Sequence, residues 1–281
     1  LGAGSIAVTM AKTLNGMENA RAYAVGSRSL EKAQAFAEKN QVEKAYGSYE
    51  ALFADPEVEL IYVAVPHSHH CQAMKMALEA GKPVLCEKAF TANAAQAEEI
   101  LRLSEEKGIF VGEAMWTRFL PSRAMIDEVI RSGEIGKVHM ITANLGYDIR
   151  TVERLRNPEL AGGALLDVGI YPLTFIRMIT DAKIASMDTS CVKLETGVDA
   201  QNAATFVFED GCMASMHSSM LGGTEQAGIV YGDQGYLIAW NINNVNKIQI
   251  FDNNRKLIRE MQVPEQITGF EYEVQAAIEA I

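Results

Sequence analysis

The sequence has no continuous apolar run long enough to cross a membrane. Runs such as Leu60 to Val65 reach only strand length, whereas a membrane-spanning helix needs about 20 apolar residues. No targeting segment is visible. Basic residues are fewer than acidic ones, which leaves a net charge of −11. This charge would repel nucleic acid or an anionic membrane surface at long range. We therefore expect neither partner, and an anionic ligand must find a local positive pocket.

Cysteine is scarce as well, and its four copies are scattered. None of them forms the close pairs typical of a zinc site or a redox dithiol, so we expect reduced thiols in a cytoplasmic protein. The cysteines are Cys71, Cys86, Cys191 and Cys212. His67, His69 and His70 stand together, but adjacent histidines rarely point at one ion, and no carboxylate or cysteine pattern completes a ligand set. We therefore expect no metal site.

Proline is rare, with 7 residues among 281, and apolar residues make up 48%, as in an ordinary globular protein. This length is enough for two domains. Residues 1–115 alternate apolar runs with amphipathic stretches, and later segments alternate residue by residue. These patterns predict an α/β protein. We expect a Rossmann doubly wound parallel sheet over residues 1–115 and a second α+β domain, with an open, largely antiparallel sheet, over residues 116–281.

Several element boundaries can be predicted from residue chemistry. Ser29 and Thr91 are expected helix N-caps. No strand precedes Gly2, so we expect the first strand of the parallel sheet to lie ahead of Leu1. The apparent helix Phe270 to Ile281 is expected to continue along the chain and to return to the first domain. The strands predicted in the second domain are Ala204–Phe208, Met213–His217, Gly228–Tyr231, Tyr236–Trp240 and Lys247–Phe251.

Small residues at the start of the chain fit the dinucleotide-binding pattern G-x-G-x-x-G/A. Such residues permit a tight turn and let backbone N–H groups approach a pyrophosphate at a helix N-terminus. The residues expected to bind it are Gly2, Gly4, Ser5 and Ile6. Glycine pairs are common in loops, so the pattern alone is a weak signal. The helix that follows and the alternating first half of the chain strengthen it.

The residues at the end of the next strand favour NADP over NAD. NAD-specific sites usually place an acidic residue about 20 positions beyond the glycines to bind the ribose 2′-hydroxyl. Here the strand ends in Gly26, Ser27 and Arg28. No acid repels a 2′-phosphate, and a hydroxyl and a guanidinium are available to bind it. The alternative is that Arg28 is a solvated arginine at a helix start.

Three further residues follow the apolar strand Leu60 to Val65. Pro66, His67 and His70 lie just beyond its carboxyl end. This is the edge of an open parallel sheet at which ligands bind. We therefore expect these residues to line the cofactor cleft.

Taken in order, several motifs resemble those of the glucose-fructose oxidoreductase and inositol dehydrogenase (Gfo/Idh/MocA) family. The similarity covers essentially the whole chain. The motifs are Gly2 to Ala7, Val65 to His70, Ala80 to Lys88, Gly133 to Val138 and Gly162 to Tyr171. The segment Met115 to Phe119 and the tyrosine at position 171 are most similar to dihydrodiol dehydrogenase and NADP-dependent pentose dehydrogenase members.

The resemblance implies roles for particular residues. Glu87 and Lys88 would lie at the cofactor, with Lys88 bound to the nicotinamide ribose. Trp116 and Arg118 would lie near the nicotinamide or substrate, although core packing explains Trp116 about as well. Two departures from the family pattern stand out: Ala89 replaces the usual proline after the lysine, and Tyr171 stands where many members carry histidine.

Alcohol oxidation explains why such residues would be gathered. A base must remove the hydroxyl proton as hydride leaves carbon, and Tyr171 is the candidate. A tyrosine has a pKa of about 10, which a nearby ammonium such as Lys88 lowers. Asp167, four residues earlier, is expected to bond Lys88 or substrate hydroxyls. Pro172 predicts that the helix is kinked or begins near this point.

We therefore predict an NADP-dependent oxidoreductase that acts on a small cyclic polyhydroxylated compound, a sugar or a dihydrodiol. The substrate class follows from the resemblance. The alternatives are a non-catalytic NADP-binding regulator and an NAD-assisted glycoside hydrolase of the same fold. We also expect a homo-oligomer formed through the open sheet, because an uncovered apolar sheet face is unfavourable in a monomer.

Overall fold

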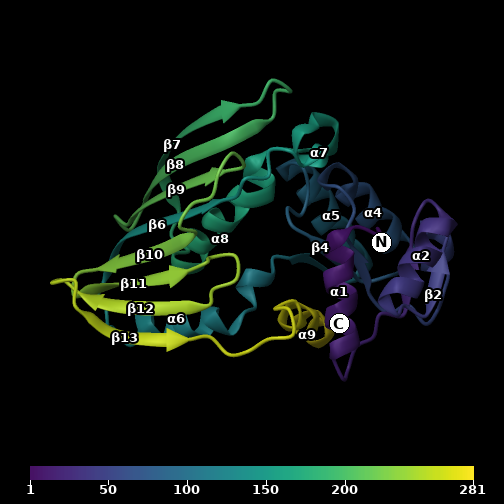
Figure 1. Ribbon diagram of the computed structural model, residues 1–281, viewed down its shortest axis with the longest axis horizontal. Coiled ribbons are helices and arrows are strands. Elements are labelled where there is room, and N and C mark those ends of the chain that lie inside the picture. The colour runs from purple at the N-terminus through teal and green to yellow at the C-terminus, as the bar shows by residue number, and fades with distance from the viewer. The chain divides into compact units, whose positions relative to one another are not determined.

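The computed structural model describes residues 1–281, and the chain divides into two compact units (Figure 1). The first unit comprises Leu1–Trp116 together with Gln266–Ile281, and the second comprises Thr117–Glu265. The C-terminal segment is therefore part of the same unit as the N-terminal half.

Short parallel strands form the centre of the first unit. They are β1 (Ala24–Gly26), β2 (Lys44–Tyr46), β3 (Ile61–Val63), β4 (Val84–Glu87) and β5 (Val111–Ala114). β1 pairs with β2, and the other three form a sheet in the order β3-β4-β5. Leu1 and Gly2 connect the two sheets, because Ala64 N–H donates to Leu1 O (2.9 Å) and Gly2 N–H donates to Gly26 O (3.1 Å). All carboxyl ends therefore meet at one edge, as the Rossmann prediction requires.

Helices cover these sheets. They are α1 (Ser5–Gly16), α2 (Leu30–Asn40), α3 (Tyr49–Phe53), α4 (His67–Glu79), α5 (Ala94–Lys107) and α9 (Glu271–Ala280). The Ser29 hydroxyl caps α2 by accepting from Lys32 N–H, as predicted. The prediction for Thr91 is wrong. Asn93 caps α5 by accepting from Gln96 N–H, and the Thr91 hydroxyl instead donates to Asn93 O, so the turn lies two residues later.

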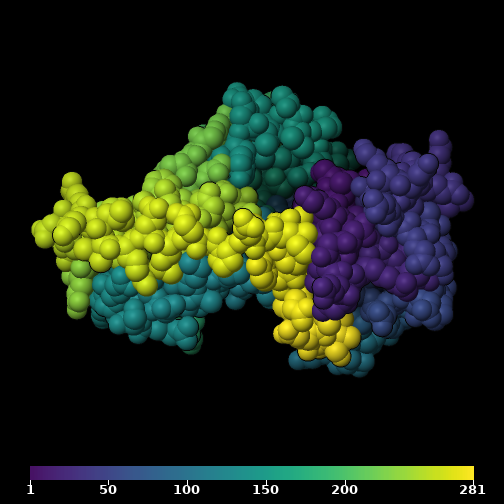
Figure 2. Space-filling view, turned by 60° about the horizontal axis from the view of Figure 1, so that its bottom comes forward, coloured from purple at the N-terminus to yellow at the C-terminus, as the bar shows by residue number.

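α9 lies against α1, as the yellow and purple elements of Figures 1 and 2 show. An apolar cluster joins the two helices to the sheet. Its buried members are Met10, Leu85, Ala114, Phe270, Val274 and Ala277. This cluster is the reason why the last helix belongs to the first unit.

Glu273 is a buried acid within this layer. Glu273 is only 1% exposed, and neither of its carboxyl oxygens has a hydrogen-bond partner. Burial, followed by the charges of Glu87 and Glu113, raises the pKa of Glu273 well above its usual value. The folded protein therefore keeps this proton above about pH 4.3, where the unfolded chain releases it. Because the folded state then binds more protons, this group lowers the stability as the pH rises.

Replacing Glu273 with methionine is expected to stabilise the protein. The substitution fills a similar volume and removes a buried polar group without a partner, so the free energy of unfolding should increase by about 1–3 kcal/mol at mildly alkaline pH. This gain in the free energy of unfolding should become smaller as the pH falls toward the ordinary carboxyl pKa of about 4.3. Urea unfolding at several pH values measures it, with Glu279→Met, an exposed position on the same helix, as the control. A loss of stability, or a gain that does not depend on pH, would contradict this account.

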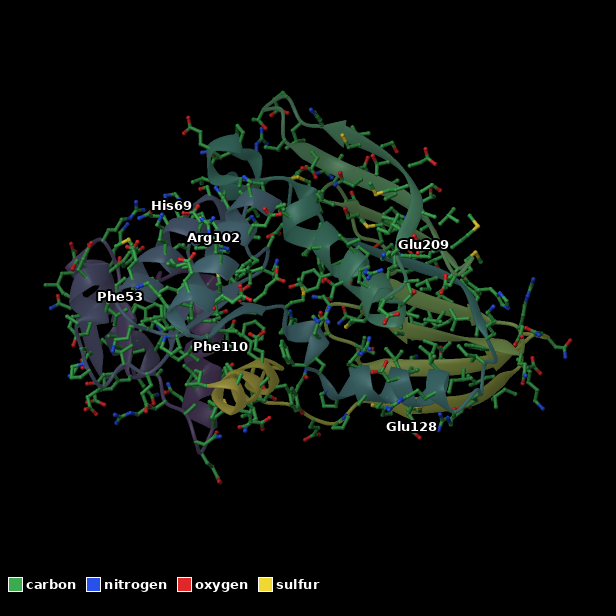
Figure 3. The ribbon with its side chains drawn as sticks, turned by 180° about the vertical axis from the view of Figure 1, so that it is seen from behind. Phe53, His69, Arg102, Phe110, Glu128 and Glu209 are labelled. Carbon is green, nitrogen blue, oxygen red and sulfur yellow. The ribbon has the colours of Figure 1, made fainter.

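An eight-stranded sheet forms the second unit, in the order β13-β12-β11-β10-β6-β9-β8-β7. Its strands are β6 (Val138–Gly146), β7 (Ile184–Lys193), β8 (Asp199–Phe208), β9 (Met213–Ser219), β10 (Ala227–Gly232), β11 (Gly235–Trp240), β12 (Lys247–Asp252) and β13 (Leu257–Gln262). Every pair is antiparallel except β6 with β9. The predicted strands are confirmed as β8 to β12. Figure 3 shows this sheet from behind, with Glu209 at the turn between β8 and β9.

Helical segments complete the second unit. They are α6 (Pro121–Arg131), α7 (Glu153–Arg156), a 3-10 turn (Pro158–Leu160), a π-helical segment (Leu165–Gly169) and α8 (Ile170–Ile179), and a further 3-10 turn (Trp116–Arg118) spans the boundary between the units. α8 packs on β6, β9 and β10, and its Phe175 lies where a side chain at Gly228 would be. The π segment explains the irregularity that Pro172 predicted, since the helix changes form just before the proline.

The sheet face opposite α8 carries a row of partly exposed apolar side chains. Neighbouring strands place its members directly opposite one another: Val207, Met213, Met140, Tyr231, Tyr236 and Phe251. The rings of Tyr236 and Phe251 stack at 5.0 Å, and Met140 and Met213 are 43% and 50% exposed.

One helical stretch, Pro158–Ile179, is long and apolar enough to cross a membrane, which differs from the sequence expectation. It joins several helical segments, and 56% of its apolar window is buried within the structure. A core helix of a globular protein satisfies the same test, so this stretch is weak grounds for a membrane segment.

Candidate active site

The glycine loop approaches the neighbouring strand too closely for a side chain. Gly2 has φ +91°, and a Cβ on it would lie 2.6 Å from Ala64 O. Gly4 is the N-cap of α1 and makes no side-chain cap bond. The first N–H groups of a helix have no intrahelical partner, so those at Ser5 and Ile6 can bind a phosphate.

Ser27 and Arg28 follow β1, beside this loop. Ser27 N–H donates to Tyr46 O (3.0 Å), and the Ser27 hydroxyl accepts from Ser29 N–H (3.3 Å). Arg28 is exposed. The first acid beyond the strand, Glu31, lies in the first turn of α2. The guanidinium is therefore the charged group at the end of β1.

The three histidines near the start of α4 have different environments. His69 is exposed on α4 (Figure 3), whereas His67 is only 6% exposed. His70 is completely buried, with Nδ1 2.8 Å from Ala89 O and Nε2 2.8 Å from Val65 O. His70 therefore does not line the cofactor surface as the sequence suggested. It ties the loop after β3 to the loop after β4, while Pro66 remains at the edge of the sheet.

Lys88 directly follows β4, at the same carboxyl edge. Glu87 accepts hydrogen bonds from the Tyr62 hydroxyl and from Lys88 N–H (3.2 Å). The Glu87 residue is 7% exposed, and burial followed by its charge raises the pKa of Tyr62 well above the usual value. The peptide bond between Lys88 and Ala89 is cis. Glu87 therefore acts here as a support for the lysine loop.

Trp116 follows β5 and packs into the first unit. Its ring meets Phe270 edge-on at 4.9 Å, and it leaves no room for a side chain at Gly269. Arg118 is exposed and belongs to the second unit. The packing role of Trp116, which the sequence left open, is thus present in the structure.

The second unit holds Asp167 and Tyr171. Asp167 lies in the π segment and Tyr171 in the first turn of α8, and these residues are 7% and 9% exposed. The start of the π segment is anchored to β8, because Leu165 N–H donates to Asp199 Oδ2 (2.6 Å). π segments are rare and occur frequently at functional sites.

Arg154, a residue that the sequence did not single out, bonds to Asp167. One of its terminal NH₂ groups lies 3.0 Å from Asp167 Oδ1. The Arg154 side chain is 48% exposed, whereas that of Asp167 is 9% exposed. A half-exposed arginine on a short helix gives no signal in the sequence. Arg154 is identified by its ion pair with Asp167 in the folded structure.

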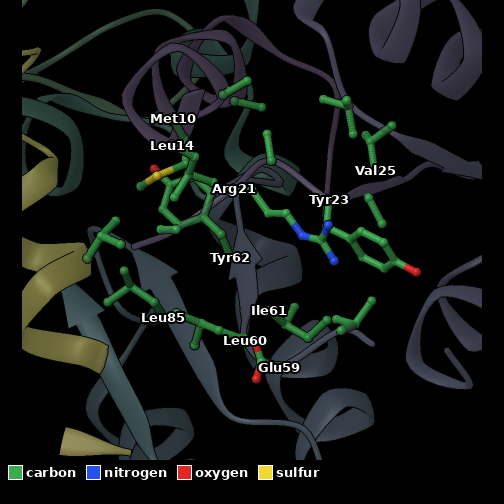
Figure 4. Close-up of a pocket in the computed structure, with 18 of the residues that line it drawn as sticks. Met10, Leu14, Arg21, Tyr23, Val25, Glu59, Leu60, Ile61, Tyr62 and Leu85 are labelled. Carbon is green, nitrogen blue, oxygen red and sulfur yellow. The ribbon is translucent and has the colours of Figure 1, made fainter. Parts of the chain in front are cut away.

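A cavity of about 750 Å³ in the first unit is not this site. Figure 4 shows it between β1 and β3, with Met10 and Leu14 of α1 above and Tyr62 and Leu85 along its walls. Its lining includes Gly2, but neither Ser5 and Ile6 at the N-terminus of α1 nor Lys88. We therefore place the candidate cofactor site at the carboxyl edge.

A parallel-sheet unit with a glycine turn, followed by a unit with a large open sheet, has the architecture of a dinucleotide-binding Rossmann domain joined to a second α+β domain. Residues 1–114 match the family described as "Oxidoreductase family, NAD-binding Rossmann fold", and residues 124–238 match the GFO/IDH/MocA C-terminal domain. The chain belongs to the Gfo/Idh/MocA family. The predicted family and fold class are thereby confirmed.

Curated relatives include trans-1,2-dihydrobenzene-1,2-diol dehydrogenases. That of Mus musculus is 37% identical over 213 residues, which cover 75% of this chain and 64% of the relative. That of Bos taurus is 36% identical over 228 residues, covering 81% and 68%. The D-xylose 1-dehydrogenase (NADP(+)) of Hypocrea jecorina is 44% identical over 177 residues, covering 57% and 45%. The chain thus spans about two-thirds or less of the length of these relatives.

Solved structures share the fold. An aldose-aldose oxidoreductase from Caulobacter crescentus complexed with glycerol superposes with a TM-score of 0.88 at 21% identity, covering 100% of this chain and 88% of the other. A 3-ketoreductase from Actinomadura kijaniata in complex with NADP and TDP-benzene gives 0.87 at 22% identity, covering 99% and 87%. At this identity the likeness concerns the fold.

Proposed function

We propose that this protein is an NADP-dependent oxidoreductase that transfers hydride between the nicotinamide and a CH–OH carbon of a small cyclic polyol, sugar or dihydrodiol. The observation that carries the proposal is the carboxyl edge of the first unit, where Arg28 and Lys88 follow the parallel strands β1 and β4 and the glycine turn is bonded to Gly26 of β1. The names of the curated relatives, which are dihydrodiol and NADP-dependent xylose dehydrogenases, support the substrate class.

The residues of the first unit fit NADP. Gly2 leaves no room for a side chain, and the N-terminus of α1 offers N–H groups to the pyrophosphate. Ser27 and Arg28 would hold the 2′-phosphate, and Lys88 the nicotinamide ribose. When bound, NADP supplies the hydride acceptor. NAD fits less well because no acid follows β1 directly.

Residues of the second unit would handle the proton. We assign Tyr171 as the group that takes the hydroxyl proton at its phenolic oxygen and returns it in the reverse direction. Lys88 would stabilise the phenolate through its positive charge. Asp167, held by Arg154, would accept a hydrogen bond from a substrate hydroxyl.

The test is to mix the full-length protein with NADP or NAD and with pentoses, hexoses and dihydrodiols, and to follow the nicotinamide absorbance. Oxidation of at least one of these compounds with NADP is expected. No change with any of them would overturn the proposed function.

Replacing Arg28 with alanine is expected to weaken the preference for NADP. Loss of a charge-assisted bond to the 2′-phosphate should lower kcat/KM for NADP by about 10–100-fold, while kcat/KM for NAD stays nearly unchanged. The control is Arg21→Ala, an exposed arginine paired with Glu43 in the same unit. Equal losses with both cofactors would show that Arg28 does not select the 2′-phosphate.

We further propose a cytoplasmic homo-oligomer formed through the apolar row of the second sheet. All four cysteines are free, as in a reducing compartment. Two copies that face each other could bury Tyr231, Tyr236 and Phe251 along with the exposed methionines. A light-scattering mass equal to one chain would contradict the oligomer.

A further inference from the structure

His70 is fully buried in the first turn of α4, at the carboxyl edge of the first unit. Each of its ring nitrogens lies 2.8 Å from a backbone carbonyl oxygen, Nδ1 from Ala89 O and Nε2 from Val65 O. A carbonyl oxygen can only accept a hydrogen bond, so each bond requires a proton on the ring nitrogen. A neutral imidazole has one proton for both.

The surroundings of the two carbonyl groups decide which nitrogen holds that proton. Burial lowers the pKa of His70, although the bonds to the carbonyl oxygens act in the opposite direction, so the ring is neutral at alkaline pH. The bond to Ala89 O is buried, whereas Val65 is partly exposed. An acceptor that water does not reach is costly to leave without a donor, while a carbonyl near solvent can bond to water. The proton of the neutral ring therefore belongs on Nδ1, which donates it to Ala89 O.

Ala89 directly follows Lys88, so this bond fixes the loop that presents the lysine. The same loop is bonded from the side of β5, because Phe90 N–H donates to Glu113 Oε1 (2.9 Å). His70 adds a bond from a different element, to the carbonyl group between these two residues. That element is anchored in the buried core of the first unit. The residues of α4 that anchor it are Ala73, Met74, Ala77 and Leu78.

We propose that His70 is a positioning residue for the reaction, which holds Lys88 in place by donating from Nδ1 to Ala89 O. The inference rests on the proposed function, in which Lys88 stabilises the phenolate and holds the nicotinamide ribose. A displacement of about 1 Å can cost on the order of 100-fold in rate. The bond therefore acts on turnover, although His70 itself touches neither cofactor nor substrate.

Asparagine and glutamine divide the two bonds of His70 between them. Both side chains end in an NH₂ donor; that of asparagine reaches the place of Nδ1, and that of glutamine reaches the place of Nε2. In the full-length protein with NADP, His70→Asn should keep kcat within about 3-fold of wild type, whereas His70→Gln and His70→Leu should lower it by about 10–100-fold. The control is His69→Gln, at the exposed neighbouring position, which should leave kcat unchanged.

A double variant separates positioning from a general loss of folded protein. With Lys88→Met there is no charge left to place, so adding His70→Gln should change kcat by less than about 3-fold. A loss of folded protein would instead lower kcat by the same factor with and without the lysine. Equal losses in His70→Asn and His70→Gln, or an equal further loss in the Lys88→Met background, overturn the positioning role.

The position of the ring proton is measured in wild type, so the inference does not depend on the folding of a variant. The chain has five histidines, few enough for their ring nitrogens to be assigned by ¹⁵N NMR. At about pH 8, above the ordinary histidine pKa, the His70 proton is expected on Nδ1, and a proton on Nε2 alone overturns the inference. If wild type oxidises no polyol, sugar or dihydrodiol, the proposed function fails, and the ring proton still decides whether His70 holds the lysine loop.

Discussion

Replacing Lys88 with methionine is expected to lower kcat/KM for the oxidised substrate by about 10²–10⁴-fold. The methionine keeps the length of the side chain and removes its positive charge. That charge is the group assigned to stabilise the phenolate of Tyr171 and to hold the nicotinamide ribose. The loss should appear in kcat as well as in KM, because charge develops on the substrate oxygen in the transition state. Steady-state rates with NADP measure the effect.

The matched control for Lys88 is Lys75→Met. Lys75 lies on α4 in the same unit, is 39% exposed and pairs with Glu99, and such surface pairs contribute little. Its removal should leave the kinetics close to those of wild type. If NADP binds to Lys88→Met as tightly as to wild type and turnover is unchanged, the lysine has no catalytic role. A regulator that only binds the dinucleotide would then explain the fold better.

The first half of the fold could be predicted because its strands are covered by helices. β3 and β4 are short apolar runs, and Gly108 ends α5 in the left-handed conformation with φ +62°. Two strands of the second unit gave no such pattern. Every residue of β7 is exposed, and β13 is largely exposed, so neither shows the alternation of buried and exposed residues that identifies a half-buried strand.

Part of the candidate site was predictable for a similar reason. Gly2 fits the dinucleotide-binding pattern and Lys88 follows an apolar strand, so both positions could be singled out from the sequence, although the role expected of Lys88 came from the family resemblance. His70 was assigned to the correct edge, but the sequence could not show that both of its ring nitrogens face backbone carbonyl oxygens. Arg154 was missed because its importance depends on a contact with Asp167, 13 residues away. The strand expected ahead of Leu1 stays a prediction.

Replacing Tyr171 with phenylalanine is expected to have the second large effect. The change removes one oxygen from a residue that is 9% exposed and leaves its ring packing intact. If the phenol carries the proton, kcat should fall by about 10²–10⁴-fold, with a smaller change in KM. The dependence of kcat on pH should also flatten, because the group that must be deprotonated for alcohol oxidation is gone.

Tyr272→Phe is the control, since this tyrosine lies on α9 in the first unit and has no assigned role in the reaction. A Tyr171→Phe variant with the rate and pH profile of wild type would show that another group carries the proton. Lys88 would then be the candidate, because an amine can also exchange a proton with the substrate hydroxyl. In that case Lys88→Met should remove the pH dependence that Tyr171→Phe retains, so the two variants together identify the proton carrier.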